Sequence, residues 1–98
     1  MMKVEHNTEK CWFIIREDGF EAHLAYQLTA SVMDIRHTIV PQEIGRRGIA
    51  ALLMETACNY AREHNYRIRA TCAYASVWLK RHSGYDWEDA CQGDSCAI

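Results

Sequence analysis

The chain has 98 residues, 49% of them hydrophobic and 24% charged, and its formal net charge at pH 7 is −2. These values fit a single globular domain with a modest core, spanning residues 1–98. The negative charge excludes a nucleic-acid binder that works by bulk positive charge. No apolar run approaches the length of a membrane span, and the N-terminus has no signal-peptide pattern. We therefore expect a cytoplasmic protein, without nucleic-acid or membrane partners, that is a monomer or a weak homodimer.

Three β-strands are predicted in the first 29 residues. Residues 3–7 and 11–16 are short segments, the second rich in aromatic and β-branched side chains. Asp18 and Gly19 tolerate positive φ and therefore predict a tight hairpin. Residues 20–29 then alternate, which places the following side chains on one face of the third strand: Phe20, Ala22, Leu24, Tyr26 and Leu28.

A fourth strand is predicted over residues 32–40. Regular alternation places Met33, Ile35, His37 and Ile39 on one face, so His37 is in line with apolar neighbours. A histidine in that position is more often a hydrogen-bonded structural residue than a catalyst, although a bulge near the strand end could re-aim it. Pro41 ends the strand because it has no N–H to donate to a ladder.

Helical spacing then predicts a long helix over residues 47–64, with Asn65 as a left-handed cap. Its expected buried stripe is Ile49, Leu52, Leu53, Thr56, Ala57, Tyr60 and Ala61. Residues 66–72 alternate and read as a fifth strand. A strand-helix-strand unit of this kind favours parallel pairing of the fourth and fifth strands.

A second helix is predicted over residues 73–82 and is stopped by Ser83 and Gly84. Its expected shared face is Ala75, Trp78, Leu79 and His82. Residues 85–87 suggest a last short strand. Residues 88–98 are acidic with small side chains, and we expect a mobile tail there.

The loop before the long helix breaks a local rule. Arg46 and Arg47 stand at a helix start, where partial positive charge prefers Asp or Glu. With Gly45 and Gly48 beside them, exposed backbone N–H groups and the helix dipole would suit a phosphate. The alternative is an ordinary connection with solvated arginines.

This loop resembles the acetyl-CoA signature of the GNAT superfamily of N-acetyltransferases, written Gln/Arg-x-x-Gly-x-Gly/Ala. Gly48, Ile49 and Ala50 match its last three positions, whereas Gly45 replaces the first Gln or Arg, and Arg46 stands where glycine is common. The chain also resembles a small stand-alone GNAT-like group over roughly residues 3–87. The matching blocks are His37, Thr38, Val40, Pro41; Arg47, Gly48, Ile49, Ala50; Cys72, Ala73, Tyr74, Ala75; and His82, Ser83, Gly84, Tyr85.

The resemblance implies a mixed α/β fold: an antiparallel meander of about four strands, then helix-strand-helix, with strands four and five parallel and splayed. It implies acetyl-CoA as co-substrate and an amine of a small molecule or protein as acceptor. The implied cofactor-binding residues are Thr38, Ile39, Val40, Gly45, Arg46, Arg47, Gly48, Ile49 and Ala50. The chain lacks the paired helices that help form the acceptor site of larger members, so the acceptor is not identified.

Three residues are candidates for catalysis. Cys72 could attack the thioester or simply pack as a small buried hydrophobe. Tyr74 could protonate the leaving thiolate or belong to the core, and His37 could act as a base or be structural. Glu43 is a more remote base candidate. We expect direct transfer, with Cys72 lining the thioester pocket.

Two other classes remain open. One is a CoA-binding or regulatory module without turnover. The other, weaker, is a metal or redox sensor using Cys72, Cys91, Cys96 and nearby histidines. The five cysteines lack a small-disulfide-domain spacing and are expected to be free thiols. The four residues between Cys91 and Cys96 match no common zinc pattern, so no metal site is expected.

Overall fold

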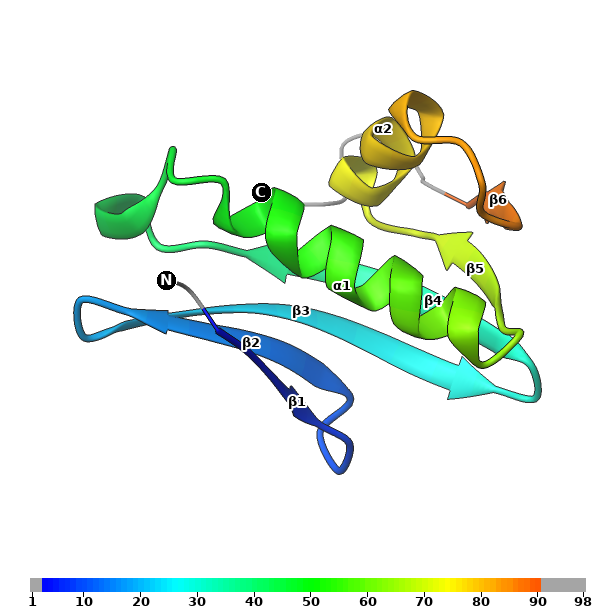
Figure 1. The fold of residues 1–98 in the computed structure, drawn as a ribbon, viewed down its shortest axis with the longest axis horizontal. Helices are drawn as coiled ribbons and strands as arrows, with labels where there is room; N and C mark the ends of the chain where they lie inside the picture. Colours follow the sequence, from blue (N-terminus) through cyan, green and yellow to red (C-terminus); the bar gives the residue numbers. More distant parts are fainter. Residues whose placement is uncertain (1–2, 91–98) are drawn as a thin grey trace.

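A computed structural model describes residues 3–90 of the chain (Figure 1). Its elements, in order, are β1 (Val4–Asn7), β2 (Trp12–Glu17), β3 (Phe20–Thr29), β4 (Val32–Ile39), the 3₁₀ turn η1 (Gln42–Ile44), α1 (Ile49–Glu63), β5 (Arg67–Ala70), α2 (Ala73–Arg81) and β6 (Trp87–Asp89). Within this part of the chain, neither helix is long and apolar enough to cross a membrane.

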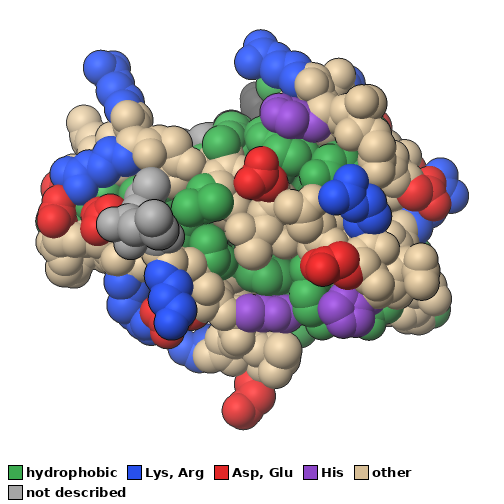
Figure 2. Space-filling model, viewed as in Figure 1, with side chains coloured by type: hydrophobic (Ala, Val, Ile, Leu, Met, Phe, Trp, Pro, Cys, Tyr) green, Lys and Arg blue, Asp and Glu red, His purple; other side chains and the backbone are tan. Residues whose placement is uncertain are grey.

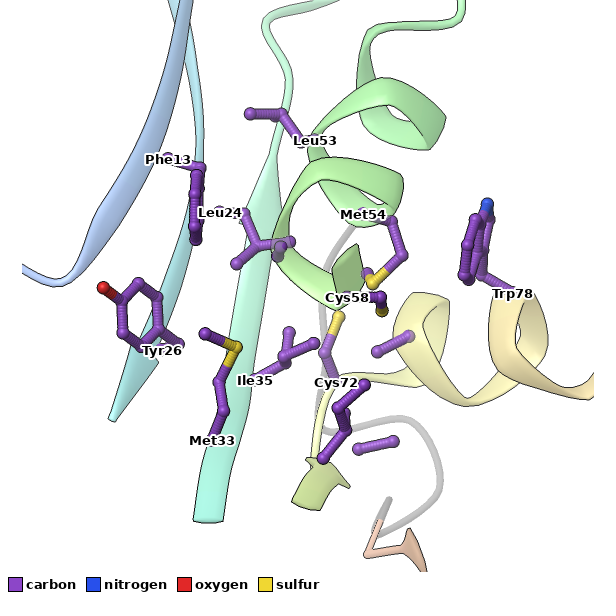
Figure 3. Packing of buried hydrophobic residues seen from close by; sticks show 14 of the residues in the cluster. Phe13, Leu24, Tyr26, Met33, Ile35, Leu53, Met54, Cys58, Cys72 and Trp78 are labelled. Carbon is purple, nitrogen blue, oxygen red and sulfur yellow. The ribbon is translucent and has the colours of Figure 1, made fainter. Parts of the chain in front are cut away.

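One sheet contains all six strands in sequence order. The pairs from β1 to β4 are antiparallel, whereas β5 pairs in parallel with both β4 and β6. Both helices lie on the same side of β4 (Figure 3) and contribute to one core with the inner side chains of the sheet. We call the opposite side of the sheet its outer face. The predicted mixed α/β fold, with a meander and parallel central strands, is confirmed.

Local turn chemistry behaves as expected. Asp18 and Gly19 have φ of 51° and 80°, the positive values that a two-residue hairpin turn needs. Asn65 follows α1 with φ of 60°, so the predicted left-handed cap is confirmed. Phe20 and Leu28, at the two ends of β3, are 38% and 39% exposed, so only the middle of the predicted apolar face is buried.

A β-bulge changes the face assignments on β4. In the register with β3, Tyr26 pairs with Ile35 and the preceding Ala25 pairs with His37, which leaves Arg36 as the extra residue. Met33 and Ile35 are buried in the core, as is Thr38, which is fully covered, whereas Ile39 is 45% exposed. The predicted alignment of His37 and Ile39 with Met33 and Ile35 is therefore wrong, because the bulge reverses the alternation after Ile35.

The start and the buried face of α1 also differ from the prediction. The helix starts at Ile49 and not at residue 47, because Gly48 takes φ of 76° as its N-cap. Met54 and Cys58 are fully buried, although the predicted stripe omits them. Leu52, Thr56 and Tyr60 are only half-buried. Figure 3 shows Met54 and Cys58 on the side of α1 that faces α2, so a second helix widens the buried face beyond a single stripe.

The C-terminal elements are shifted relative to the prediction. β5 ends at Ala70, and Cys72 becomes the N-cap of α2. His82 is exposed and stacks on Trp78 with 3.8 Å between ring centroids, so it does not share the buried face. β6 extends to Asp89 and includes the first residues of the expected tail. Residues 91–98, with Cys91 and Cys96, lie outside the described residues.

Candidate functional site

The loop between β4 and α1 is a compact turn anchored in the core. Ile44 is fully buried, its N–H donates to the Pro41 carbonyl at 3.1 Å, and the Gly45 N–H donates to the Gln42 carbonyl at 3.1 Å. A Cβ on Gly45 would lie 3.3 Å from the same Gln42 oxygen, so the turn favours glycine there. Arg46 takes φ of 60°, a conformation that glycine adopts without steric cost.

The first turn of α1 has free backbone donors. Gly48 offers no side-chain cap, and the first turn has no acidic residue. The N–H of Leu52 makes a helical hydrogen bond at 3.0 Å, to the Gly48 carbonyl. The N–H groups of Ile49, Ala50 and Ala51 precede that bond and have no acceptor within the helix. They add to the positive end of the helix dipole.

A cavity of about 310 Å³ lies against this turn. Its lining residues are Val40, Gly45, Arg46, Gly48, Ile49, Ala50, Ala51 and Tyr74. Six of the nine predicted cofactor residues thus meet at one cavity, while Thr38, Ile39 and Arg47 do not line it. Ala51 was missed, although the unsatisfied N–H groups of any helix start would have indicated it. A larger hollow of about 400 Å³ includes Arg62 and Tyr85, at the far end of α1, and contains none of the predicted residues.

The two loop arginines have different surroundings. Arg47 Nη1 lies 2.6 Å from Asp18 Oδ2, at the tip of the β2–β3 hairpin. Arg46 is exposed and forms no ion pair with the other residues between 3 and 90. Figure 2 shows basic side chains projecting at the end of the molecule where this loop lies. Arg46 is therefore the loop arginine whose charge is available to an anion.

Tyr74 reaches the cavity from the first turn of α2. Its phenol is half-buried, and burial, with a smaller contribution from the nearby Cys72 thiol, raises the pKa of Tyr74 above its usual value of 10.0. The phenol is consequently protonated at neutral pH and can donate a proton into the cavity.

Cys72 lies in the core and does not line the cavity. Its side chain is fully buried, and Sγ lies 4.0 Å from Thr38 Oγ1. Figure 3 shows it between Ile35 of β4 and Cys58 of α1. The backbone N–H groups of Thr71 and Cys72 both donate to the Ile35 carbonyl, at 3.2 and 3.0 Å. These bonds hold the start of α2 against β4 at the point where the pairing of β4 with β5 ends.

His37 lies on the outer face, away from Cys72. Its ring centroid is 5.6 Å from that of His23, which stacks on Trp12 at 3.9 Å. Burial, and then the neighbouring His37, lower the pKa of His23. His23 and Trp12 were not predicted as site residues, because the sequence pattern alone did not show which strand faces would meet. The structure thus brings Tyr74, but neither Cys72 nor His37, to the loop cavity.

The described residues contain no group of three or more His, Cys, Asp or Glu side chains suited to a metal ion. Cys11, Cys58 and Cys72 are free thiols. The part of the metal or redox hypothesis that depends on Cys91 and Cys96 falls outside the described residues.

Comparison with known proteins gives consistent results. A family model described as GCN5-related N-acetyl-transferase matches residues 12–89. Protein NATD1 from Bos taurus is 31% identical over 84 residues, covering 83% of this chain and 74% of its own length. Protein NATD1 from Homo sapiens is 30% identical with the same coverage. The solution structure of a "GCN5-like putative N-acetyltransferase" from Staphylococcus aureus matches with a TM-score of 0.70 and 23% identity, covering 95% of this chain and 94% of the other.

Proposed function

The chain belongs to the GCN5-related N-acetyltransferase family, and we propose that it binds acetyl-CoA and transfers the acetyl group to an amine. The observation that carries this proposal is the loop cavity, where Arg46, the free N–H groups of the first α1 turn and Tyr74 converge. A phosphate needs the first two features, and a leaving thiolate needs the third.

The lining residues fit the chemical parts of acetyl-CoA. The N–H groups of Ile49, Ala50 and Ala51, with the exposed Arg46 guanidinium, would hold the pyrophosphate. Beyond the last β4–β5 pair at Ile35 and Ala70, the edge of β4 that faces β5 has no strand partner among residues 3–90, so backbone groups of Ile39 and Val40 on that edge would meet the amides of the pantetheine arm. Arg47 would contribute less, because Asp18 already holds its guanidinium.

The transfer needs one proton removed and one supplied. The amine nitrogen forms a bond to the acetyl carbon, the carbon–sulfur bond breaks, and the Tyr74 phenol gives its proton to the departing thiolate. A base accepts the proton that the amine loses, and His37 is our candidate. Full burial of Cys72 supports direct attack by the amine over an acetyl-cysteine intermediate, because a nucleophile must reach the thioester.

A CoA-binding module without turnover is the second candidate. One observation favours it. Cys72 is buried and His37 lies on the outer face, so among the described residues 3–90 Tyr74 is the only predicted catalytic residue that lines the loop cavity. Tight binding of acetyl-CoA without thiol release, in a broad screen of amines, would select the module.

The test of the cofactor site uses Ala50, a half-buried cavity residue in the first turn of α1. Ala50→Glu places a carboxylate beside the expected phosphates, yet a carboxylate there suits the helix dipole, so the fold should be retained. We expect calorimetry to show at least a tenfold loss of acetyl-CoA affinity, about 1.4 kcal/mol. Ala50→Gln is the neutral control of equal size and should lose much less. Equal affinities in Ala50→Glu and the unmodified protein would reject the loop assignment.

A further inference from the structure

A second hollow, of about 370 Å³, lies on the outer face of the sheet, opposite the helices. Its lining residues are Gln27, Thr29, Val32, Asp34, Arg36 and Arg69. Gln27, Asp34 and Arg69 are direct neighbours in the register of β3, β4 and β5. Because residues 33, 35, 68 and 70 point into the core, alternation directs Asp34 and Arg69 outwards. We call this feature the outer hollow.

Among the residues that line the outer hollow, the accessible charge is positive. The Asp34 side chain is only 16% exposed, since Oδ1 accepts a hydrogen bond from Thr71 Oγ1 at 2.6 Å and Oδ2 one from Arg36 Nη1 at 3.1 Å. The side chains of Arg36 and Arg69 are 50% and 52% exposed. Arg69 Nε forms an ion pair with Glu88 at 4.0 Å, too long for a hydrogen bond, and Glu88 also pairs with Arg67 and does not line the outer hollow. Two guanidinium groups are therefore presented to solvent around a largely covered carboxylate, which suits a carboxylate ligand.

The bulge connects this hollow to the proposed chemistry. Because Arg36 is the extra residue, His37 lies on the same outer face as Asp34, and the exposed Arg36 directly precedes it on β4. Along β4, His37 is three positions beyond Asp34, roughly 7–10 Å at the usual rise of a strand. The β4–β5 ladder ends at Ile35 and Ala70, so beyond the hollow β4 is no longer paired with β5, although it stays paired with β3 up to Ile39.

We propose that the outer hollow is the acceptor site, and that the acceptor is an amine carrying a carboxylate several bonds from its nitrogen. Arg69, assisted by Arg36, binds the carboxylate, and the amine then lies towards His37 and the end of β4 that is not paired with β5. This inference rests on the proposed acetyl transfer, because it names the class of molecule that receives the acetyl group.

The test compares acceptors that differ only in charge at the far end. The probes are 6-aminohexanoate, hexylamine and the diamine cadaverine, each assayed by thiol release from acetyl-CoA. We expect kcat/KM to be at least tenfold higher for 6-aminohexanoate than for hexylamine. Arg69→Gln should lower kcat/KM for 6-aminohexanoate at least fivefold and should lower kcat/KM for hexylamine by a smaller factor.

Arg67→Gln is the matched control. Arg67 lies on the same strand with similar exposure, 51%, but is 3.6 Å from both Asp86 and Glu88 and does not line the outer hollow. Arg67→Gln should leave kcat/KM unchanged for both 6-aminohexanoate and hexylamine. A preference for cadaverine, or equal losses in the two variants, would overturn the acceptor assignment.

A binding measurement separates failure of this inference from failure of the proposed function. In the complex with CoA, 6-aminohexanoate should shift the backbone amide NMR signals of Gln27, Asp34 and Arg69, and the shifts should vanish in Arg69→Gln. CoA binding without these shifts would reject the acceptor site and leave the cofactor proposal standing. Absence of CoA binding in calorimetry would reject the proposed function, and the acceptor site with it.

Discussion

Replacement of Arg46 tests the loop most directly, because this residue combines an unfavourable backbone conformation with the proposed role on a phosphate. Its φ of 60° costs a non-glycine residue roughly 1–2 kcal/mol. Glycine removes that cost but loses roughly 0.5–1 kcal/mol through its greater freedom in the unfolded chain. Arg46→Gly should therefore be more stable than Arg46→Ala by about 0.5 kcal/mol, or roughly 2–4 °C in Tm for a domain of this size.

The Arg46→Gly and Arg46→Ala pair separates backbone from charge. Both variants remove the guanidinium, so the conflict with the helix dipole disappears equally in each, and only the backbone preference differs. Both should lose CoA affinity by a similar factor, about tenfold or 1.4 kcal/mol, with less dependence on salt. Thermal unfolding and calorimetric titration measure the two effects. Equal melting temperatures would refute the strain argument, and unchanged affinity in both would refute the phosphate role.

Three further predictions follow from the surroundings of single residues. Asp18→Asn removes the ion-pair partner of Arg47 and should raise CoA affinity at low salt. Because the ion pair is exposed, the free energy of unfolding should change by no more than about 1 kcal/mol. Lower CoA affinity would contradict the assignment of the loop to the phosphates. Cys72→Ala should keep substantial turnover, and acetyl-CoA alone should add no acetyl group detectable by mass spectrometry, whereas a stoichiometric adduct on Cys72 that an amine discharges would show covalent catalysis. Burial, and then His64, lower the pKa of His6 below 6.5, so the unfolded chain binds more protons near that pH and the free energy of unfolding should decrease as pH falls through about 6.5. Denaturation at pH 7.5 and 5.5 should show a smaller decrease for His6→Phe, and an unchanged decrease would exclude His6 as a source.

Much of the fold could be predicted because its signals are local. The hairpin at Asp18 and Gly19 and the cap at Asn65 depend on which residues accept positive φ. The helical spacing after residue 48 and the strand-helix-strand order determine the parallel pairing of β4 and β5. The conflict of Arg46 and Arg47 with the helix dipole likewise indicated the loop that borders the cavity.

The remaining features depend on contacts between distant segments. Strand alternation predicts the face of a side chain only while the register is regular. The bulge at Arg36 exchanges the faces of His37 and Thr38, and alternation alone does not locate it. The burial of Met54 and Cys58 depends on a neighbouring helix, and the engagement of Arg47 depends on a hairpin tip 29 positions away. Sequence periodicity thus determined which elements form, whereas tertiary packing decided which side chains share a surface, because that depends on register and on neighbours that no local pattern encodes.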